Sequence, residues 1–295
     1  MRRACALVFV AVVVLASACA PAGAPASGEA IPVLGTENFY ADLLAQIGGT
    51  RVTVSSILND PKADPHEYEA NPQTAKLVAD AKVVIVNGIG YDDFMDKLLA
   101  ASTKPDRVVL NVQDILKKGD GDNAHVWYDP ATMPKVAEAA TAALSKLDPQ
   151  NASYFATQKA KYLAALKPID DKIASLRAKY TGAPVAFTEP VAEYQADAIG
   201  LRVLTPEGFM KAIEQAVDPA PSDVAAERDL LTGKKVRVLV YNSQVTSPLT
   251  KDIHDLAVKS GVPVLGVAET IPPQFKTYAE WMLSQLAELE TALAK

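Results

Sequence analysis

The chain has 295 residues, of which 49% are hydrophobic and 22% are charged, and its formal net charge is −6. This length suits one large domain or two modest ones, and the apolar content is sufficient to build their cores. The acidic balance argues against nucleic acid and anionic membrane surfaces as partners. It is compatible with a cation as ligand, without establishing one.

The first residues have the pattern of a secretion signal. Arg2 and Arg3 precede an apolar, uncharged stretch at 4–16. That stretch is shorter than the roughly 20 residues that a membrane-spanning helix needs. We therefore predict that residues 1–18 are a signal peptide.

Cys19 follows the small residues Ala-Ser-Ala, which resemble a bacterial lipobox. We predict that Cys19 is lipidated, with ordinary cleavage near Ala18 or Ala20 as the alternative. Residues 19–30 are rich in Ala, Pro and Gly and would form a flexible tether. Because Cys5 lies inside the signal, the mature chain would keep one cysteine, so any metal must be bound by imidazole and oxygen ligands.

After residue 31, short apolar runs alternate with amphipathic stretches. Strands are predicted at 31–34, 52–57, 83–87 and 108–112, and helices at 39–47, 74–81, 93–101 and 130–147. Alternation of this kind predicts a parallel sheet with right-handed crossovers. We assign residues 31–148 to a first α/β lobe.

A long helix is predicted next. Between residues 151 and 180, apolar side chains recur at spacings of three, four and seven. A helix of this length spans roughly 45 Å. Pro168 lies inside it and is expected to kink it or to split it in two. We assign residues 149–182 to this linking helix.

A second alternating half follows the helix. Strands are predicted at 185–188, 202–204, 236–241 and 262–267, and helices at 191–199, 222–231, 249–260 and 277–293. The predicted fold is therefore α/β, with two lobes whose central sheets are mostly parallel, joined by one long helix; the second lobe is 183–295. Ligands of such sheets bind beyond the carboxyl ends of the strands, here in the cleft between the lobes.

Two of the three histidines follow predicted strands of the first lobe: His66 follows the second strand and His125 the fourth. Because parallel strands end at the same edge, the two imidazoles can converge on a metal ion. By composition alone, two surface histidines in turns are an equal alternative. Asp64, Glu67 and Asp129 are near enough in sequence to hold the far ring nitrogens.

The second lobe offers Glu189, which ends its first predicted strand and should face the cleft. The alternative for Glu189 is a carboxylate that only stabilises a helix N-terminus. Residues 241–244 end a later strand and could offer an amide or hydroxyl oxygen, or could simply form a turn. His254 lies beside two aspartates on a predicted helix and is expected to be solvated.

Signatures of enzymes are missing. Ala70 stands where a zinc protease motif beginning at His66 would need its second histidine. The sequence also contains no Gly-x-Ser-x-Gly elbow. A secreted metal-dependent hydrolase is therefore not supported, and we predict that the protein is not an enzyme.

The motifs at 64–69 (Asp-Pro-His-Glu-Tyr-Glu) and 125–130 (His-Val-Trp-Tyr-Asp-Pro), together with Asn87-Gly88 and Glu189, resemble a known family. This is the cluster-nine, adhesin-like family of metal-binding lipoproteins of bacterial ABC importers for zinc and manganese. The resemblance covers nearly everything after residue 31. It implies two α/β lobes joined by one rigid helix, which agrees with the periodicity.

The resemblance also implies a function. A protein of this kind is an extracytoplasmic receptor, in the periplasm or anchored to the cell membrane by its lipid. It captures one divalent ion, manganese or zinc, and delivers it to an ABC permease and its ATPase. We expect a monomer. The alternative is an adhesion lipoprotein in which the metal is structural.

Carried over residue by residue, the resemblance makes His66 and His125 the two ligands of the first lobe and Glu189 the third ligand. The fourth family ligand is usually an aspartate after a later strand of the second lobe, and here the loop 241–246 has no carboxylate. Gln244 is the predicted substitute, with Asn242 or a water as alternatives. Glutamate at the third position resembles the manganese-type members, although zinc should bind more tightly in vitro to any such site.

Overall fold

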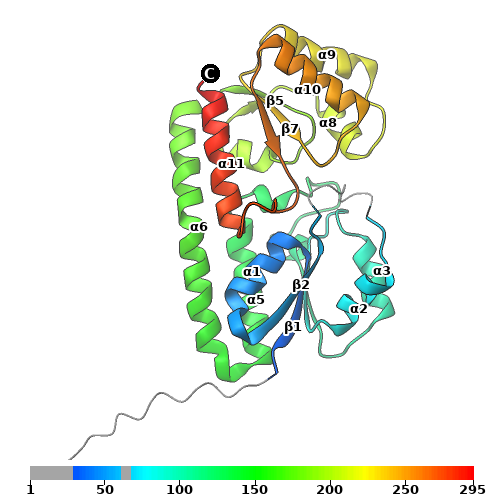
Figure 1. Cartoon of the computed structure of the whole chain (residues 1–295), viewed down its shortest axis with the longest axis vertical. Helices are drawn as coiled ribbons and strands as arrows, with labels where there is room; N and C mark the ends of the chain where they lie inside the picture. The colour runs from blue at the N-terminus through cyan, green and yellow to red at the C-terminus, as the bar shows by residue number, and fades with distance from the viewer. Residues whose placement is uncertain (1–28, 61–67) are drawn as a thin grey trace, which may run out of the picture.

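The computed structural model describes residues 29–60 and 68–295, which form two α/β lobes joined by a long helix (Figure 1). The predicted fold class is confirmed. The predictions for Cys19, Asp64, His66 and Glu67 lie outside the described residues.

A four-stranded parallel sheet forms the centre of the first lobe, with strand order β2-β1-β3-β4. Its strands are β1 (Ile31–Glu37), β2 (Val52–Leu58), β3 (Val83–Val86) and β4 (Val108–Asn111). Its helices are α1 (Asn38–Gly48), α2 (Pro72–Asp80), α3 (Phe94–Ala101), α4 (Val112–Leu116) and α5 (Thr132–Leu147). All four residues of β3, Val-Val-Ile-Val, are buried, as expected for an interior parallel strand.

The second lobe repeats this plan, with strand order β6-β5-β7-β8 and parallel pairing. Its strands are β5 (Pro184–Phe187), β6 (Arg202–Val203), β7 (Leu239–Asn242) and β8 (Val264–Val267). Its helices are α7 (Glu193–Ile199), α8 (Glu207–Glu214), α9 (Pro221–Thr232), α10 (Pro248–Ser260) and α11 (Tyr278–Leu293). Helix α8 was not predicted from the sequence.

The linking helix α6 (Ala152–Tyr180) runs unbroken for 29 residues along both lobes (Figure 1). Pro168 was expected to kink this helix or to split it, and the split is wrong. Pro168 cannot bond to the carbonyl of Ala164, but both residues are exposed, so water can satisfy that carbonyl. Of the helices in the described part of the chain, none is long and apolar enough to cross a membrane.

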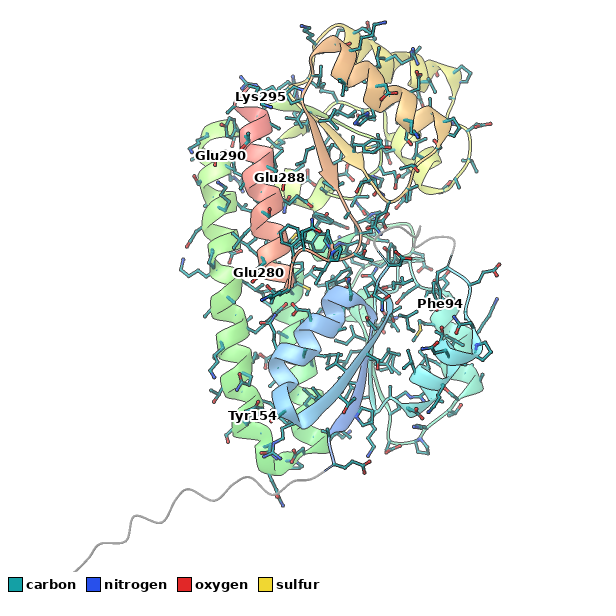
Figure 2. All side chains as sticks on the ribbon, in the orientation of Figure 1. Phe94, Tyr154, Glu280, Glu288, Glu290 and Lys295 are labelled. Atoms are coloured by element: carbon teal, nitrogen blue, oxygen red, sulfur yellow. The ribbon has the colours of Figure 1, made fainter. Side chains whose placement is uncertain are left out.

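The last helix, α11, returns along α6. Glu290 of α11 accepts hydrogen bonds from Lys172 and Lys179 of α6, and Figure 2 shows Glu290 beside that helix. These two lysines hold the pKa of the Glu290 carboxyl at about 2. Both pairs lie at the surface, where Lys172 and Glu290 are half-buried and Lys179 is exposed, so they align the two helices more than they stabilise the fold.

The lobes share one hydrophobic core at the side of the linking helix. Trp127 of the first lobe stacks on Phe39, with ring centroids 4.7 Å apart. Tyr278 of α11 donates its hydroxyl hydrogen to the Trp127 carbonyl at 2.6 Å, and Tyr128 donates to the Ala268 carbonyl at 2.7 Å. The lobes are therefore packed against each other and not merely tethered.

Candidate metal centre

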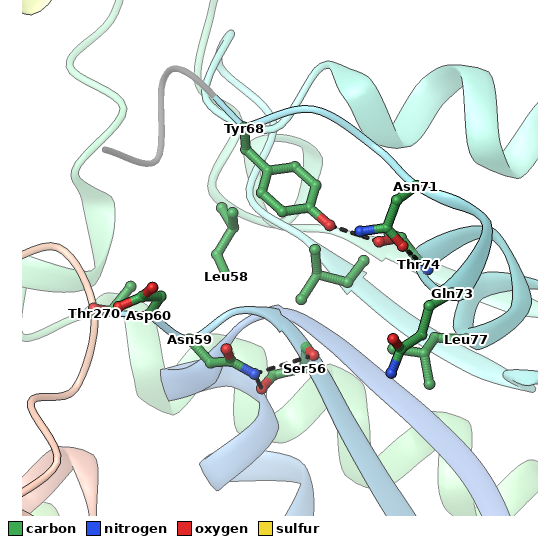
Figure 3. A pocket seen from close by; sticks show the side chains of 11 residues that line it. Ser56, Leu58, Asn59, Asp60, Tyr68, Asn71, Gln73, Thr74, Leu77 and Thr270 are labelled. Atoms are coloured by element: carbon green, nitrogen blue, oxygen red, sulfur yellow. Dashed lines mark hydrogen bonds between the residues drawn. The ribbon is translucent and has the colours of Figure 1, made fainter. Parts of the chain in front are cut away.

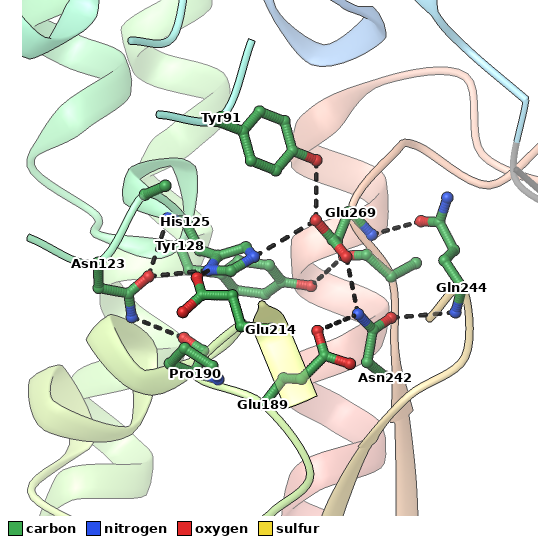
Figure 4. Close-up of polar contacts among 12 residues, drawn as sticks. Tyr91, Asn123, His125, Tyr128, Glu189, Pro190, Glu214, Asn242, Gln244 and Glu269 are labelled. Carbon is green, nitrogen blue, oxygen red and sulfur yellow. Dashed lines mark hydrogen bonds and ion pairs between the residues drawn. The ribbon is translucent and has the colours of Figure 1, made fainter. Parts of the chain in front are cut away.

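The polar centre of the molecule lies between the lobes, beyond the carboxyl ends of the strands (Figure 4). The first lobe contributes His125, which precedes the short 3-10 helix η3 (Val126–Tyr128). The second lobe contributes Glu189, which follows β5, Asn242, which ends β7, and Glu269, which follows β8. The exposed fractions of these four residues are 0%, 1%, 1% and 0%, so the centre is closed to bulk water.

His125 and Glu269 meet across the cleft. The Nε2 atom of His125 lies 3.3 Å from Oε2 of Glu269. The imidazole is held edge-on by Trp127 and Tyr91, with ring centroids 5.2 and 5.9 Å away. At metal–ligand distances of about 2.1 Å, two donors this far apart subtend an angle of about 105°, close to tetrahedral.

Asn123 determines which nitrogen of His125 is available. Its Nδ2 donates to the Pro190 carbonyl at 2.7 Å, which orients the amide and turns Oδ1 toward His125. Oδ1 then accepts from the His125 backbone N–H at 2.9 Å and lies 2.8 Å from Nδ1. A carbonyl oxygen can only accept, so Nδ1 carries the hydrogen in this contact, and Nε2 is the ring nitrogen that faces Glu269.

Tyr91 fixes Glu269 from the opposite lobe by donating its hydroxyl hydrogen to Oε2 at 2.8 Å. Burial and the Glu269 carboxylate raise the pKa of Tyr91, so the hydroxyl stays protonated. The loop before Tyr91 is tightly wound, with φ of 71° at Gly88, 58° at Ile89 and 76° at Gly90. A left-handed β-branched residue such as Ile89 is strained, as is often seen next to functional sites.

Asp92 holds this loop at its base. Its two carboxylate oxygens accept from the backbone N–H groups of Asn87 and Gly88, each at 2.8 Å. Burial raises the pKa of the Asp92 carboxyl to about 6. The position of the Tyr91 hydroxyl thus depends on a buried carboxyl as well as on strained backbone.

The two carboxylates of the second lobe are joined by one amide. The Nδ2 atom of Asn242 donates to Oε2 of Glu189 at 3.1 Å and to Oε1 of Glu269 at 2.7 Å (Figure 4). Each carboxylate therefore has one oxygen turned toward the amide. For Glu269, the other oxygen is the one that faces His125.

Gln244, the predicted fourth ligand, acts here on the backbone. Its Oε1 accepts from the N–H groups of Glu269 at 2.5 Å and of Thr270 at 2.9 Å. This oxygen holds the loop that presents Glu269. A buried carboxylate, Glu269, lies after the neighbouring strand β8.

The predicted partner of the imidazole, Asp129, lies at the start of α5, where its Oδ1 accepts from the Ala131 N–H at 2.9 Å. The oxygen that faces Nδ1 of His125 belongs instead to Asn123, a residue to which the sequence pattern assigned no role. Glu214 of α8 also lies near this nitrogen, with Oε1 3.7 Å from Nδ1. Its negative charge favours a protonated Nδ1 as well.

Within residues 29–60 and 68–295, no three His, Cys, Asp or Glu side chains are grouped as a metal centre. The described residues bring together His125 and Glu269 directly, and Glu189 through Asn242. The other histidine ligand predicted for the first lobe, His66, lies in the interval that is not described.

A separate pocket of about 360 Å³ opens between the end of β2 and the start of α2 (Figure 3). Tyr68, Thr74 and Leu77 line it from the first lobe, and Thr270 reaches it from the second. Tyr68 and Thr74 hydrogen bond to each other at 2.6 Å. Thr270 follows Glu269, so this pocket adjoins the loop that presents the buried carboxylate.

Comparison with protein families finds a match over residues 33–292 to the family described as the periplasmic zinc-uptake complex component A. The manganese-binding lipoprotein MntA of Halalkalibacterium halodurans is 27% identical over 59% of each chain. The manganese ABC transporter substrate-binding lipoprotein PsaA of Streptococcus mitis is 23% identical over 98% of this chain and 97% of its own.

Solved structures show the same architecture. The periplasmic zinc-binding protein TroA of Treponema pallidum superposes with a TM-score of 0.76 at 18% identity, over 90% of this chain and 100% of that one. The substrate-binding protein FpvC of Pseudomonas aeruginosa, solved with Mn²⁺, gives a TM-score of 0.74 at 20% identity, over 90% and 99%. At these identities the likeness establishes the fold alone.

Proposed function

The chain belongs to the family of periplasmic zinc-uptake component A proteins, and from this premise we propose that it is the extracytoplasmic metal receptor of an ABC importer. It captures one divalent transition metal ion, manganese or zinc, between its lobes and delivers it to the membrane permease. The observation that supports this most directly is the contact between His125 and Glu269, two fully buried side chains from different lobes, 3.3 Å apart.

The donor set suits such an ion. His125 supplies a neutral imidazole nitrogen, and Glu269 and Glu189 supply carboxylate oxygens; His66, carried over from the family motif, supplies the second imidazole. Two carboxylates and two neutral imidazoles match the charge of a divalent cation. Imidazole with oxygen donors is suited to zinc and manganese.

The relatives favour transport over adhesion, because they are named as substrate-binding lipoproteins of ABC transporters. Handing over an ion needs no covalent chemistry, so no catalytic residue is assigned. We also propose that the chain is anchored to the membrane through Cys19, that residues 19–30 are its tether, and that it is a monomer. Metal affinity should fall at mildly acidic pH, because imidazole must be unprotonated to bind a metal.

The test is metal analysis of protein purified from its own compartment, followed by titration of the metal-stripped protein with Mn²⁺ and Zn²⁺. We expect one ion per chain, with a loss of affinity of about 100-fold or more for His125→Ala. Glu288→Gln, an exposed change on α11, is the control and should bind as the unaltered protein does. Unchanged affinity in His125→Ala would refute the proposed site.

A further inference from the structure

Asn242 has an unusual position among the buried amides: its one NH₂ group serves two carboxylates at once. It donates to Glu189 Oε2 and to Glu269 Oε1, at 3.1 and 2.7 Å. These two carboxylates come from different loops of the second lobe, and both are proposed metal ligands. The amide therefore engages one oxygen of each ligand and leaves each with one oxygen that it does not touch.

The orientation of the amide is fixed by its surroundings. Its Oδ1 accepts from the Gln244 backbone N–H at 3.0 Å, so the NH₂ group must face the carboxylates. The backbone N–H of Asn242 donates to Thr188 Oγ1 at 3.0 Å, which ties the end of β7 to the residue preceding Glu189. Asn242 is only 1% exposed, and water cannot readily take over its hydrogen bonds.

We propose that Asn242 is a specificity-determining positioning residue, which restricts Glu189 and Glu269 to one-oxygen coordination and so favours a four-coordinate metal ion. This inference rests on the proposed function. For Glu269 the restriction is visible, because Oε1 is hydrogen bonded to Asn242 while Oε2 faces His125. Binding through both oxygens would require the carboxylate to rotate and break the short bond to the amide.

The consequence is a choice between metals. With one oxygen from each carboxylate and the imidazole nitrogen of His125, the described residues give the ion three donors, which suits the four-coordinate geometry that zinc adopts. Manganese favours octahedral, oxygen-rich coordination, which carboxylates can supply by binding through both oxygens. Asn242 thus penalises manganese relative to zinc without touching either ion.

The experiment compares the Mn²⁺ and Zn²⁺ dissociation constants of Asn242→Leu, which replaces the amide by an apolar group of similar size. We expect the ratio of the Mn²⁺ constant to the Zn²⁺ constant to fall by about tenfold or more, within the usual range for residues that hold metal ligands. X-ray absorption of the zinc-loaded variant should show a higher coordination number than that of the unaltered protein. Gln285→Leu is the matched control: it removes a buried amide that bonds to Tyr128.

A second variant, Asn242→Ala, removes the amide donor without adding a new oxygen near the ion, and should lower the same ratio. It decides the question if Asn242→Leu does not fold. A ratio unchanged in the folded variants, with both affinities reduced equally, would show that Asn242 is merely structural and overturn the inference. If the unaltered protein bound neither ion, the proposed function itself would be wrong, so the two failures are distinguishable.

Discussion

The two halves of the centre are built in different ways. His125, from the first lobe, is a neutral donor held by packing against Trp127 and Tyr91 and by one amide oxygen. The second lobe supplies two carboxylates, Glu189 and Glu269, held by hydrogen bonds from the side chain of Asn242. Aromatic contacts suffice to orient a neutral ring, but a buried carboxylate needs donors to offset its desolvation.

The largest loss of metal affinity should come from changing a proposed ligand of the second lobe, and a smaller loss from changing a residue that holds that ligand in place. Glu269→Gln keeps the size but removes the charge that a metal ion needs, and should weaken metal binding by about 1,000-fold. Gln244→Met removes only the acceptor for the Glu269 and Thr270 N–H groups and should cost about 10- to 100-fold, as for residues behind a ligand. Isothermal titration with Zn²⁺ measures both, and the reverse order would restore Gln244 as the ligand.

The first half can be tested through Asn123. Replacing it with alanine removes the acceptor that keeps the proton on Nδ1 of His125, so the ring can also adopt the tautomer whose Nε2 is protonated. We expect metal affinity to fall by about 10- to 100-fold. Asn111→Ala, which removes another half-buried asparagine amide, the helix cap of α4, is the control. NMR of the imidazole nitrogens should show the altered tautomer; an unchanged one would contradict the role given to Asn123.

Glu227 of α9 tests whether a buried carboxylate needs hydrogen-bond donors. It lies in the same lobe as Glu189 and Glu269 and is fully buried, but no side-chain amide among the described residues donates to its carboxyl. Burial raises its pKa to about 7, offset in part by the Thr205 hydroxyl. The folded state therefore keeps its proton where the unfolded chain has lost it, and this group lowers stability as pH rises from about 4.5 to about 7.

Glu227→Gln should thus raise the free energy of unfolding at pH 8 by on the order of 3 kcal/mol and leave it unchanged near pH 4. Urea denaturation at the two pH values measures the difference. An equal gain in the free energy of unfolding at both pH values would mean that it does not come from removing the ionisable carboxyl of Glu227.

The smallest expected effect is a change in the distance between the two lobes when the metal binds. The shared core around Trp127 and the pair of helices α6 and α11 oppose a wide hinge. We expect the radius of gyration from X-ray scattering to change little when Zn²⁺ is added to the metal-stripped protein. A large contraction would show that the lobes close on the ion, and that the packing seen here is not rigid.

From the sequence, a local motif singled out His125 and a strand end singled out Glu189. The structure places both at the cleft between the lobes, and their roles as metal ligands stay predictions. Glu269 was missed because the missing carboxylate was sought after β7, whereas parallel strands end at one edge and β8 lies beside β7. Applying the strand-end argument to every strand of the second lobe would have found it.

Other details depend on tertiary contacts that no local pattern contains. Asn123 and Asn242 look like turn residues in sequence, and their roles appear only when chain segments 67 and 53 residues apart meet. Helix α8 is only eight residues long, and a prediction from periodicity passed over it although Phe209, Met210 and Ile213 are buried. Pro168 was expected to kink α6 or to divide it, and the continuous helix could not be foreseen because the exposure of Pro168 depends on tertiary packing.

The return of α11 to the first lobe bears on the order in which the chain can fold. Tyr278 and Trp281, near the end of the sequence, cover Trp127 and Phe39 near its beginning. While the chain is being made, the first lobe lacks these partners and cannot complete its core. A precursor that stays incompletely folded until its last helix is synthesised can still cross the membrane as an unfolded chain. Deleting α11 should therefore leave a secreted chain that binds hydrophobic dyes and is quickly degraded.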